Sequence, residues 1–119
     1  MMSNATSIAE LRVLPNNRLE NAMEKLRNIH PGEVLKEEFL TPMGITAYRL
    51  AKDTGLTQTR ISEIIRSRRR VTAETALRLG KYFGVSPRFW LGLQDDFDLE
   101  EEERAHRKEI EAIRPVSTE

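Results

Sequence analysis

The sequence contains no cysteine and only two histidines, His30 and His106, which lie far apart in a chain of 119 residues. Because thiols are missing, disulfide bonds, thiolate zinc sites and cysteine nucleophiles are excluded. We therefore predict neither a metal site nor a cofactor. The chain also has no run of about 18 apolar residues and no N-terminal signal-peptide pattern. These absences predict a cytoplasmic protein with no membrane partner.

Sequence patterns for catalysis are missing as well. The chain has no HExxH pattern, no glycine-rich phosphate loop and no serine with a suitable histidine base. The acids at residues 100–103 are consecutive, so they point in different directions around a helix and form no pair for acid–base chemistry. We predict that the protein is not an enzyme.

The chain carries no net charge, because 19 basic residues balance 19 acidic ones. The two signs are unevenly distributed along it, however. Residues 46–70 carry seven Lys or Arg against two acids, whereas residues 95–119 carry ten acids against four bases. A dense basic segment is typical of a protein that binds a polyanion. The acidic end is interpreted as a solvated helix, and the alternative is a surface for a basic partner.

The chain does contain a series of short amphipathic helices, without any long strand pattern. Pro31 suits the first turn of a helix that buries Leu35 and Phe39 and that Pro42 and Gly44 end. Residues that favour the start of a helix follow at Thr46, Thr57, Thr72 and Ser86. The helix after Thr72 is expected to bury Ala76, Leu77, Leu79 and Phe83.

Residues 47–66 have the pattern of a helix-turn-helix. Ala51 is small where two helices would cross, and Gly55 tolerates the positive φ of a tight turn. Leu56, Ile61 and Ile64 then face inward. The outer face of the second helix carries Gln58, Thr59, Ser62 and Arg66.

These outward side chains are hydrogen-bonding types that can contact base edges, and Thr57 at the helix N-terminus suits a phosphate. Arg68, Arg69 and Arg70 extend the positive surface beyond the helix. The alternative is a solvated polar face kept soluble by its arginines. Because Glu63 is the only acid between Leu56 and Thr72, the pattern favours DNA.

A family resemblance spans residues 30–99. The segments IHPGEVLKEEFLTPMGIT, LAKDTGLTQTRISEII and VTAETALRLGKYFGVSPRFWLGLQDDFDL resemble the HigA-type antitoxins, a branch of the Xre or phage-repressor helix-turn-helix family. The resemblance implies an all-α, five-helix, lambda-repressor-like DNA-binding domain. Residues 1–29 would form a partly helical N-terminal arm, and residues 100–119 an acidic C-terminal tail or helix extension.

The resemblance also implies partners. It predicts a homodimer on palindromic double-stranded operator DNA, autorepression of the operon, and neutralisation of a HigB or RelE-like toxin that cleaves mRNA. The base-reading helix is placed at residues 57–66. The predicted DNA contacts are Thr46, Thr57, Gln58, Thr59, Arg60, Ser62, Arg66, Arg68, Arg69 and Arg70.

Many relatives have glycine where this chain has Ser67. The competing interpretations are a stand-alone Xre-family repressor without a toxin and a protein-binding helical adaptor.

Two apolar groups are candidates for protein contacts. The cluster of Phe89, Trp90, Leu93 and Phe97 is mainly core rather than a ligand pocket, but it holds more apolar positions than one helix face buries. We therefore predict that it also supplies the dimer interface. In the arm, the stripe of Leu19, Ala22, Met23 and Leu26 belongs to a helix too short to be stable alone.

The arm stripe therefore needs a surface to cover it. We predict that Leu19, Met23 and Leu26 bind the toxin. The alternatives are that the stripe packs on its own domain or on the second subunit.

Overall fold

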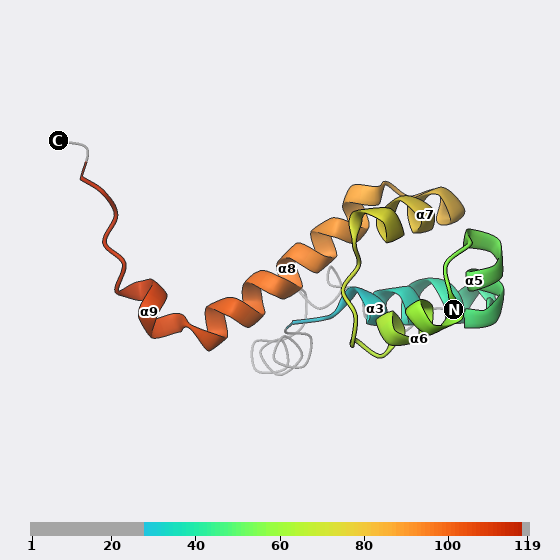
Figure 1. Cartoon of the computed structure of the whole chain (residues 1–119), viewed down its shortest axis with the longest axis horizontal. Helices are drawn as coiled ribbons and strands as arrows, with labels where there is room; N and C mark the ends of the chain where they lie inside the picture. The colour runs from blue at the N-terminus through green and yellow to red at the C-terminus, as the bar shows by residue number, and fades with distance from the viewer. Residues whose placement is uncertain (1–27, 118–119) are drawn as a thin grey trace, which may run out of the picture.

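The structure is a computed structural model that describes residues 28–117. The described part of the chain begins with one continuous helical run made of α3 (Pro31–Val34), the π-helical η1 (Leu35–Leu40) and α4 (Thr41–Met43). The helices that follow are α5 (Ala47–Thr54), α6 (Gln58–Ile65), α7 (Ala73–Phe83), α8 (Pro87–Ala105) and α9 (Arg107–Glu111). Within residues 28–117 there is no strand, and the predicted all-α fold is confirmed (Figure 1). The predicted five helices correspond to the first run and α5 to α8, and α9 is additional.

Side-chain caps begin four of these helices where the sequence predicts them. The hydroxyls of Thr46 and Thr57 each accept a hydrogen bond at 3.0 Å from the backbone N–H three residues later. Thr72 does the same at 3.5 Å, and Ser86 accepts from the N–H of Arg88 at 3.1 Å. Each cap satisfies a backbone donor that the helix itself leaves unpaired.

Two expectations about the helices are wrong. Pro42 does not end the first run, which continues to Met43 before Gly44 turns at φ 65°. Pro42 lies in α4, directly after the π-helical segment, where the run accommodates a residue that has no backbone N–H. Leu77 is 60% exposed because α7 buries only the face that carries Ala76 and Leu79.

The core lies between the first run and the later helices. Its buried apolar members are Leu35, Leu40, Leu50, Ala51, Leu56, Ile61, Ile64, Val71, Ala76, Leu79 and Trp90. The Trp90 ring lies 5.0 Å from that of Phe39 and 5.1 Å from that of Phe89. The predicted burial of Trp90 is confirmed at 0% exposure. Trp90 therefore offers no surface to a second subunit, and its assignment to the dimer interface is corrected.

The helix α8 is longer than the domain it packs on. Its first half contacts α7 and α3, and its second half projects away from the globular part (Figure 1). Residues 101–117 are exposed throughout, and Leu99 is 69% exposed. None of the helices within residues 28–117 has the length and apolar character needed to span a bilayer. The predicted toxin-binding residues Leu19, Met23 and Leu26 lie outside the described residues.

Candidate nucleic-acid interface

The turn between α5 and α6 sets the position of the candidate interface. Gly55 adopts φ 79°, a left-handed conformation that glycine accepts without strain, and its N–H bonds to the carbonyl of Ala51 at 2.9 Å. The Thr54 hydroxyl donates to the carbonyl of Leu50 at 2.7 Å, and Arg78 donates to the carbonyl of Thr54 at 2.8 Å. The predicted helix-turn-helix is confirmed. Hydrogen bonds to carbonyl groups of α5 and from Arg78 on α7 hold its turn in place.

The C-terminal end of α6 is fixed by close backbone packing. A Cβ on Gly32 would lie 1.7 Å from the carbonyl oxygen of Ile64, so only glycine allows α3 to meet α6 at this distance. His30 caps α3 beside this contact, because its Nδ1 accepts a hydrogen bond from the Gly32 N–H at 2.9 Å. The sequence pattern did not reveal that position 32 requires glycine, because the contact is made with a residue 32 positions away.

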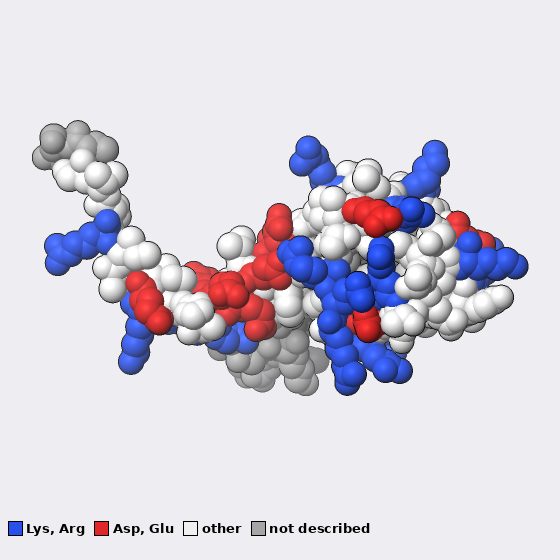
Figure 2. Space-filling view, in the orientation of Figure 1, with Lys and Arg blue, Asp and Glu red and all other residues white. Residues whose placement is uncertain are grey.

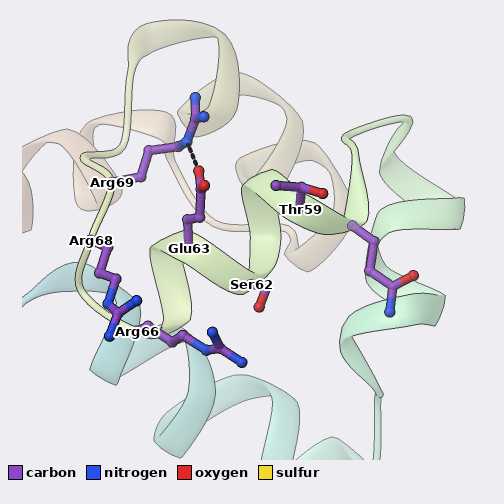
Figure 3. Close-up of a pocket in the computed structure, with 7 residues that line it drawn as sticks. Thr59, Ser62, Glu63, Arg66, Arg68 and Arg69 are labelled. Atoms are coloured by element: carbon purple, nitrogen blue, oxygen red, sulfur yellow. Dashed lines mark hydrogen bonds and ion pairs between the residues drawn. The ribbon is translucent and has the colours of Figure 1, made fainter.

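The outer face of α6 borders an open hollow of about 630 Å³ (Figure 3). Its lining residues are Gln58, Thr59, Ser62, Glu63, Arg66, Arg68 and Arg69. Six of the ten predicted DNA contacts therefore lie together on one concave surface. The seventh lining residue, Glu63, was not among the predicted contacts.

The other four predicted contacts lie outside this hollow. Thr46 and Thr57 are at the N-termini of α5 and α6, where their hydroxyls act as caps. Arg60 and Arg70 face a second hollow with Thr72, Glu74 and Thr75. The structure thus separates a central group in the hollow beside α6 from a peripheral group around it.

Carboxylates of the same chain hold three of the five arginines between residues 60 and 70. Arg69 Nε donates to Glu63 Oε1 at 2.7 Å, and Arg60 Nη1 lies 3.5 Å from Glu74 Oε1. Arg70 donates to Asp98 on α8. Exposed pairs of this kind contribute only about 0–1 kcal/mol, so an arginine can exchange its carboxylate for a phosphate at small cost.

Within residues 28–117, Arg66 and Arg68 have no carboxylate partner, and both line the hollow. Figure 2 shows Lys and Arg side chains gathered on the globular part of the molecule and Asp and Glu side chains along the projecting part of α8. The basic and acidic segments that the sequence analysis identified are therefore also separated in the folded molecule.

The exit from α6 has the geometry of a glycine-ended helix, although the residue is serine. Ser67 adopts φ 62°, its N–H bonds to the carbonyl of Ile64 at 2.9 Å, and the N–H of Arg68 bonds to the carbonyl of Glu63 at 2.8 Å. These two bonds form a Schellman motif. The departure from the family pattern at Ser67 therefore keeps the short exit that brings Arg68 and Arg69 to the hollow.

Beyond the exit, the chain is tied to α8. The N–H of Val71 donates to Oε1 of the buried Gln94 at 2.7 Å, and Gln94 Nε2 donates to Asp98 Oδ1 at 3.0 Å. Burial raises the pKa of Asp98, but hydrogen bonds from Arg70 and Gln94 and nearby positive charge outweigh it and hold the pKa below its usual value. A single glutamine in the apolar run FWLGLQ was the available signal for this anchor, and sequence reasoning missed it.

The chain has relatives among known proteins. The helix-turn-helix family model matches residues 35–90. Virulence-associated protein I of Dichelobacter nodosus is 48% identical over 90 residues, which is 76% of this chain and 82% of that protein. Antitoxin HigA-1 of Vibrio cholerae is 36% identical over 92 residues, 77% of this chain and 87% of that protein.

A solved structure is similar to this chain in both fold and sequence. The Pseudomonas aeruginosa antitoxin HigA, solved with the higBA promoter, is 37% identical and superposes with a TM-score of 0.73. The match covers 76% of this chain and 100% of that one.

Proposed function

Because the chain belongs to the HigA-type branch of the Xre helix-turn-helix family, we propose that it binds its operator as a dimer through α6 and represses its own operon. The observation that supports this most is the hollow on α6, which combines neutral hydrogen-bonding side chains with unpaired arginines. A single helix of this kind fits the major groove of B-DNA, which is about 12 Å wide.

Within this proposal the residues divide into two roles. Gln58, Thr59 and Ser62 contact base edges, because their amide and hydroxyl groups can both donate and accept. Arg66, Arg68 and Arg69 contact phosphates on the flanks of the groove. The capped N-termini of α5 and α6 point free backbone N–H groups and the positive helix end toward the DNA backbone.

The test for DNA binding compares a base contact with a phosphate contact. Gln58→Ala should cost about 1–3 kcal/mol at one base position and relax the preference there. Arg68→Ala should weaken binding to all sequences and reduce the slope of log K against log salt by about one. Arg104→Ala, on the projecting part of α8, is the matched arginine control and should leave the slope unchanged. Unchanged operator affinity in both Gln58→Ala and Ser62→Ala would exclude α6 as the base-reading element.

We further propose that the protein is an antitoxin that neutralises a HigB or RelE-like mRNA-cleaving toxin through the arm. Family membership supports a toxin partner, and the apolar stripe of Leu19, Met23 and Leu26 needs a surface to cover it. A neighbouring reading frame for a small basic protein would support the antitoxin over the stand-alone repressor.

The arm is tested by deleting residues 1–27 and measuring operator binding and toxin suppression separately. We expect the truncated protein to bind DNA normally and to lose suppression of RNA cleavage. Suppression as strong as that of the full chain would place the toxin contact on the helical domain instead.

A further inference from the structure

Among the residues that the structure describes, Glu63 is the one acid that lines the hollow on α6. It follows Thr59 by four residues, as Ser62 follows Gln58, so the exposed face of α6 carries two parallel rows of side chains. In Figure 3, Thr59 and Glu63 lie along one side of the helix, and Ser62 and Arg66 lie along the other. Glu63 therefore occupies a position equivalent to those of the predicted base contacts.

An acid at this position opposes DNA binding unless it has a specific use. Its negative charge repels the phosphates that the surrounding arginines attract. The guanidinium of Arg69 offsets this charge through the 2.7 Å bond to Glu63 Oε1 and fixes the direction of the carboxylate (Figure 3). Because the Schellman exit at Ser67 turns the chain back sharply, Arg69 lies beside α6 and can make this contact.

The carboxylate of Glu63 keeps capacity for another partner. An ionised carboxylate has about four acceptor positions, and the bond from Arg69 uses one of them. The Glu63 side chain is 41% exposed, so a group entering the hollow can reach it. An acceptor that cannot donate selects a donor and rejects other acceptors.

We propose that Glu63 determines base specificity by accepting a hydrogen bond from the N4 amino group of a cytosine in the major groove, with Arg69 as its positioning residue. This inference rests on the proposed DNA binding through α6. Guanine and thymine present acceptors at the corresponding place, which a carboxylate repels, and adenine presents its N7 acceptor next to its amino group. Cytosine is the one base that presents an amino donor with no acceptor on its own major-groove edge.

The competing role is a clamp, in which the pair between Glu63 and Arg69 only holds the chain after α6. The two roles predict different results when the charge is removed without changing the shape. Glu63→Gln keeps an acceptor oxygen but adds an amide donor, which favours adenine. A base-reading Glu63 changes the preferred base at one position, whereas a clamp changes the affinity for all sequences equally.

The experiment uses the full chain and a pool of DNA duplexes randomised over about 20 base pairs, enough for two half-sites. The wild type first selects its consensus, and each variant is then tested against every single-base change of it. We expect Glu63→Gln to lose the preference for cytosine at one position of each half-site by about tenfold or more. Arg69→Gln should weaken the same preference and lower the affinity for all sequences.

Glu74→Gln is the matched control, because Glu74 is an exposed acid that also pairs with arginine but lies outside the hollow. It should raise affinity slightly and leave every base preference unchanged. If the wild type selects a consensus and Glu63→Gln retains all of its preferences, the base-reading role is wrong, and an equal change in affinity for all sequences identifies the clamp. If the wild type selects no consensus, the proposed DNA binding itself fails, and this inference fails with it.

Discussion

At the scale of single residues, His30 connects the start of the fold to α8. Its Nδ1 caps α3 by accepting from the Gly32 N–H, and its ring meets that of Phe97 edge to face at a centroid distance of 4.8 Å. Burial lowers the pKa of His30, and the negative charge of Asp98 opposes this shift only in part. The folded protein therefore favours the neutral ring more strongly than the unfolded chain does.

This lowered pKa makes stability depend on pH. As pH falls below about 6.5, the unfolded chain binds a proton that the folded protein resists, so the free energy of unfolding should fall. The lowered pKa of Asp98 has its effect only near or below about pH 4, where stability is lost as that carboxylate is protonated. Urea unfolding at pH 7.5 and pH 5.5, values about one unit either side of the ordinary histidine pKa, measures the loss of stability across the range in which a histidine titrates.

His30→Asn is the control for the pH prediction. Asparagine retains a capping acceptor but does not titrate, so the mutant should show a flatter dependence of unfolding free energy on pH. An equal slope in mutant and wild type would show that His30 is not the responsible group.

Trp90 is the largest fully buried side chain within residues 28–117. Trp90→Ala should reduce the free energy of unfolding by about 3–5 kcal/mol, because the ring is completely buried among other aromatic rings. This is a large fraction of the total for a small domain. The neighbouring Phe89 is 39% exposed, so Phe89→Ala should lose clearly less in the same urea titration. Equal losses of unfolding free energy in the two variants would contradict the greater burial of Trp90.

At the scale of elements, the exit from α6 controls where the arginines lie. Ser67 holds a left-handed conformation that costs an L-residue about 1–2 kcal/mol. The two Schellman bonds and the contact between Glu63 and Arg69 keep it in place. The chain therefore carries local backbone strain at the point where it turns from α6 to the three arginines at residues 68–70.

We expect Ser67→Gly to stabilise the protein by about 0.5–1 kcal/mol, which is the relief of strain less the greater freedom of glycine in the unfolded chain. Ser67→Val should destabilise it by about 1 kcal/mol or more, because a β-branched residue is disfavoured at positive φ. Thermal unfolding of both variants measures the difference. A less stable Ser67→Gly would mean that the serine side chain makes a compensating contribution.

At the scale of the whole molecule, α8 presents two different faces. Trp90 and Gln94 face the core, whereas Phe89, Leu93 and Phe97 repeat every four residues along a partly exposed stripe. We name these last three residues the α8 stripe and keep them as the predicted dimer contact. A dimer would also place two α6 helices on one duplex, as a palindromic operator requires.

We expect sedimentation equilibrium to give a dimer for the wild type and a folded monomer for Phe89→Lys, because a charge in an apolar contact is costly to bury. Leu77→Lys is the matched control, since Leu77 is an exposed apolar residue on α7, away from the α8 stripe. It should remain dimeric. A stable monomeric wild type would contradict the dimer, and dimeric Phe89→Lys would place the contact elsewhere.

The sequence by itself determined the local features of this protein. The starts of α5, α6, α7 and α8 follow from hydroxyl caps that bond only two or three residues along the chain. Gly55 and the spacing of buried residues around it likewise determined the helix-turn-helix, and the polar face of α6 followed from helical periodicity. These features depend on neighbours in sequence, so the residue pattern was sufficient to predict them.

Only the tertiary structure decided which charges meet and which apolar residues are covered. Arg70 reaches Asp98 across 28 residues, and Val71 reaches Gln94 across 23. The exposure of Leu77 and the complete burial of Trp90 depend on which face of α7 and α8 the rest of the domain covers. The pairing of Glu63 with Arg69 depends in the same way on a left-handed serine that periodicity does not predict. Such contacts arise from the packing of helices against one another, and helical periodicity alone carries no information about that packing.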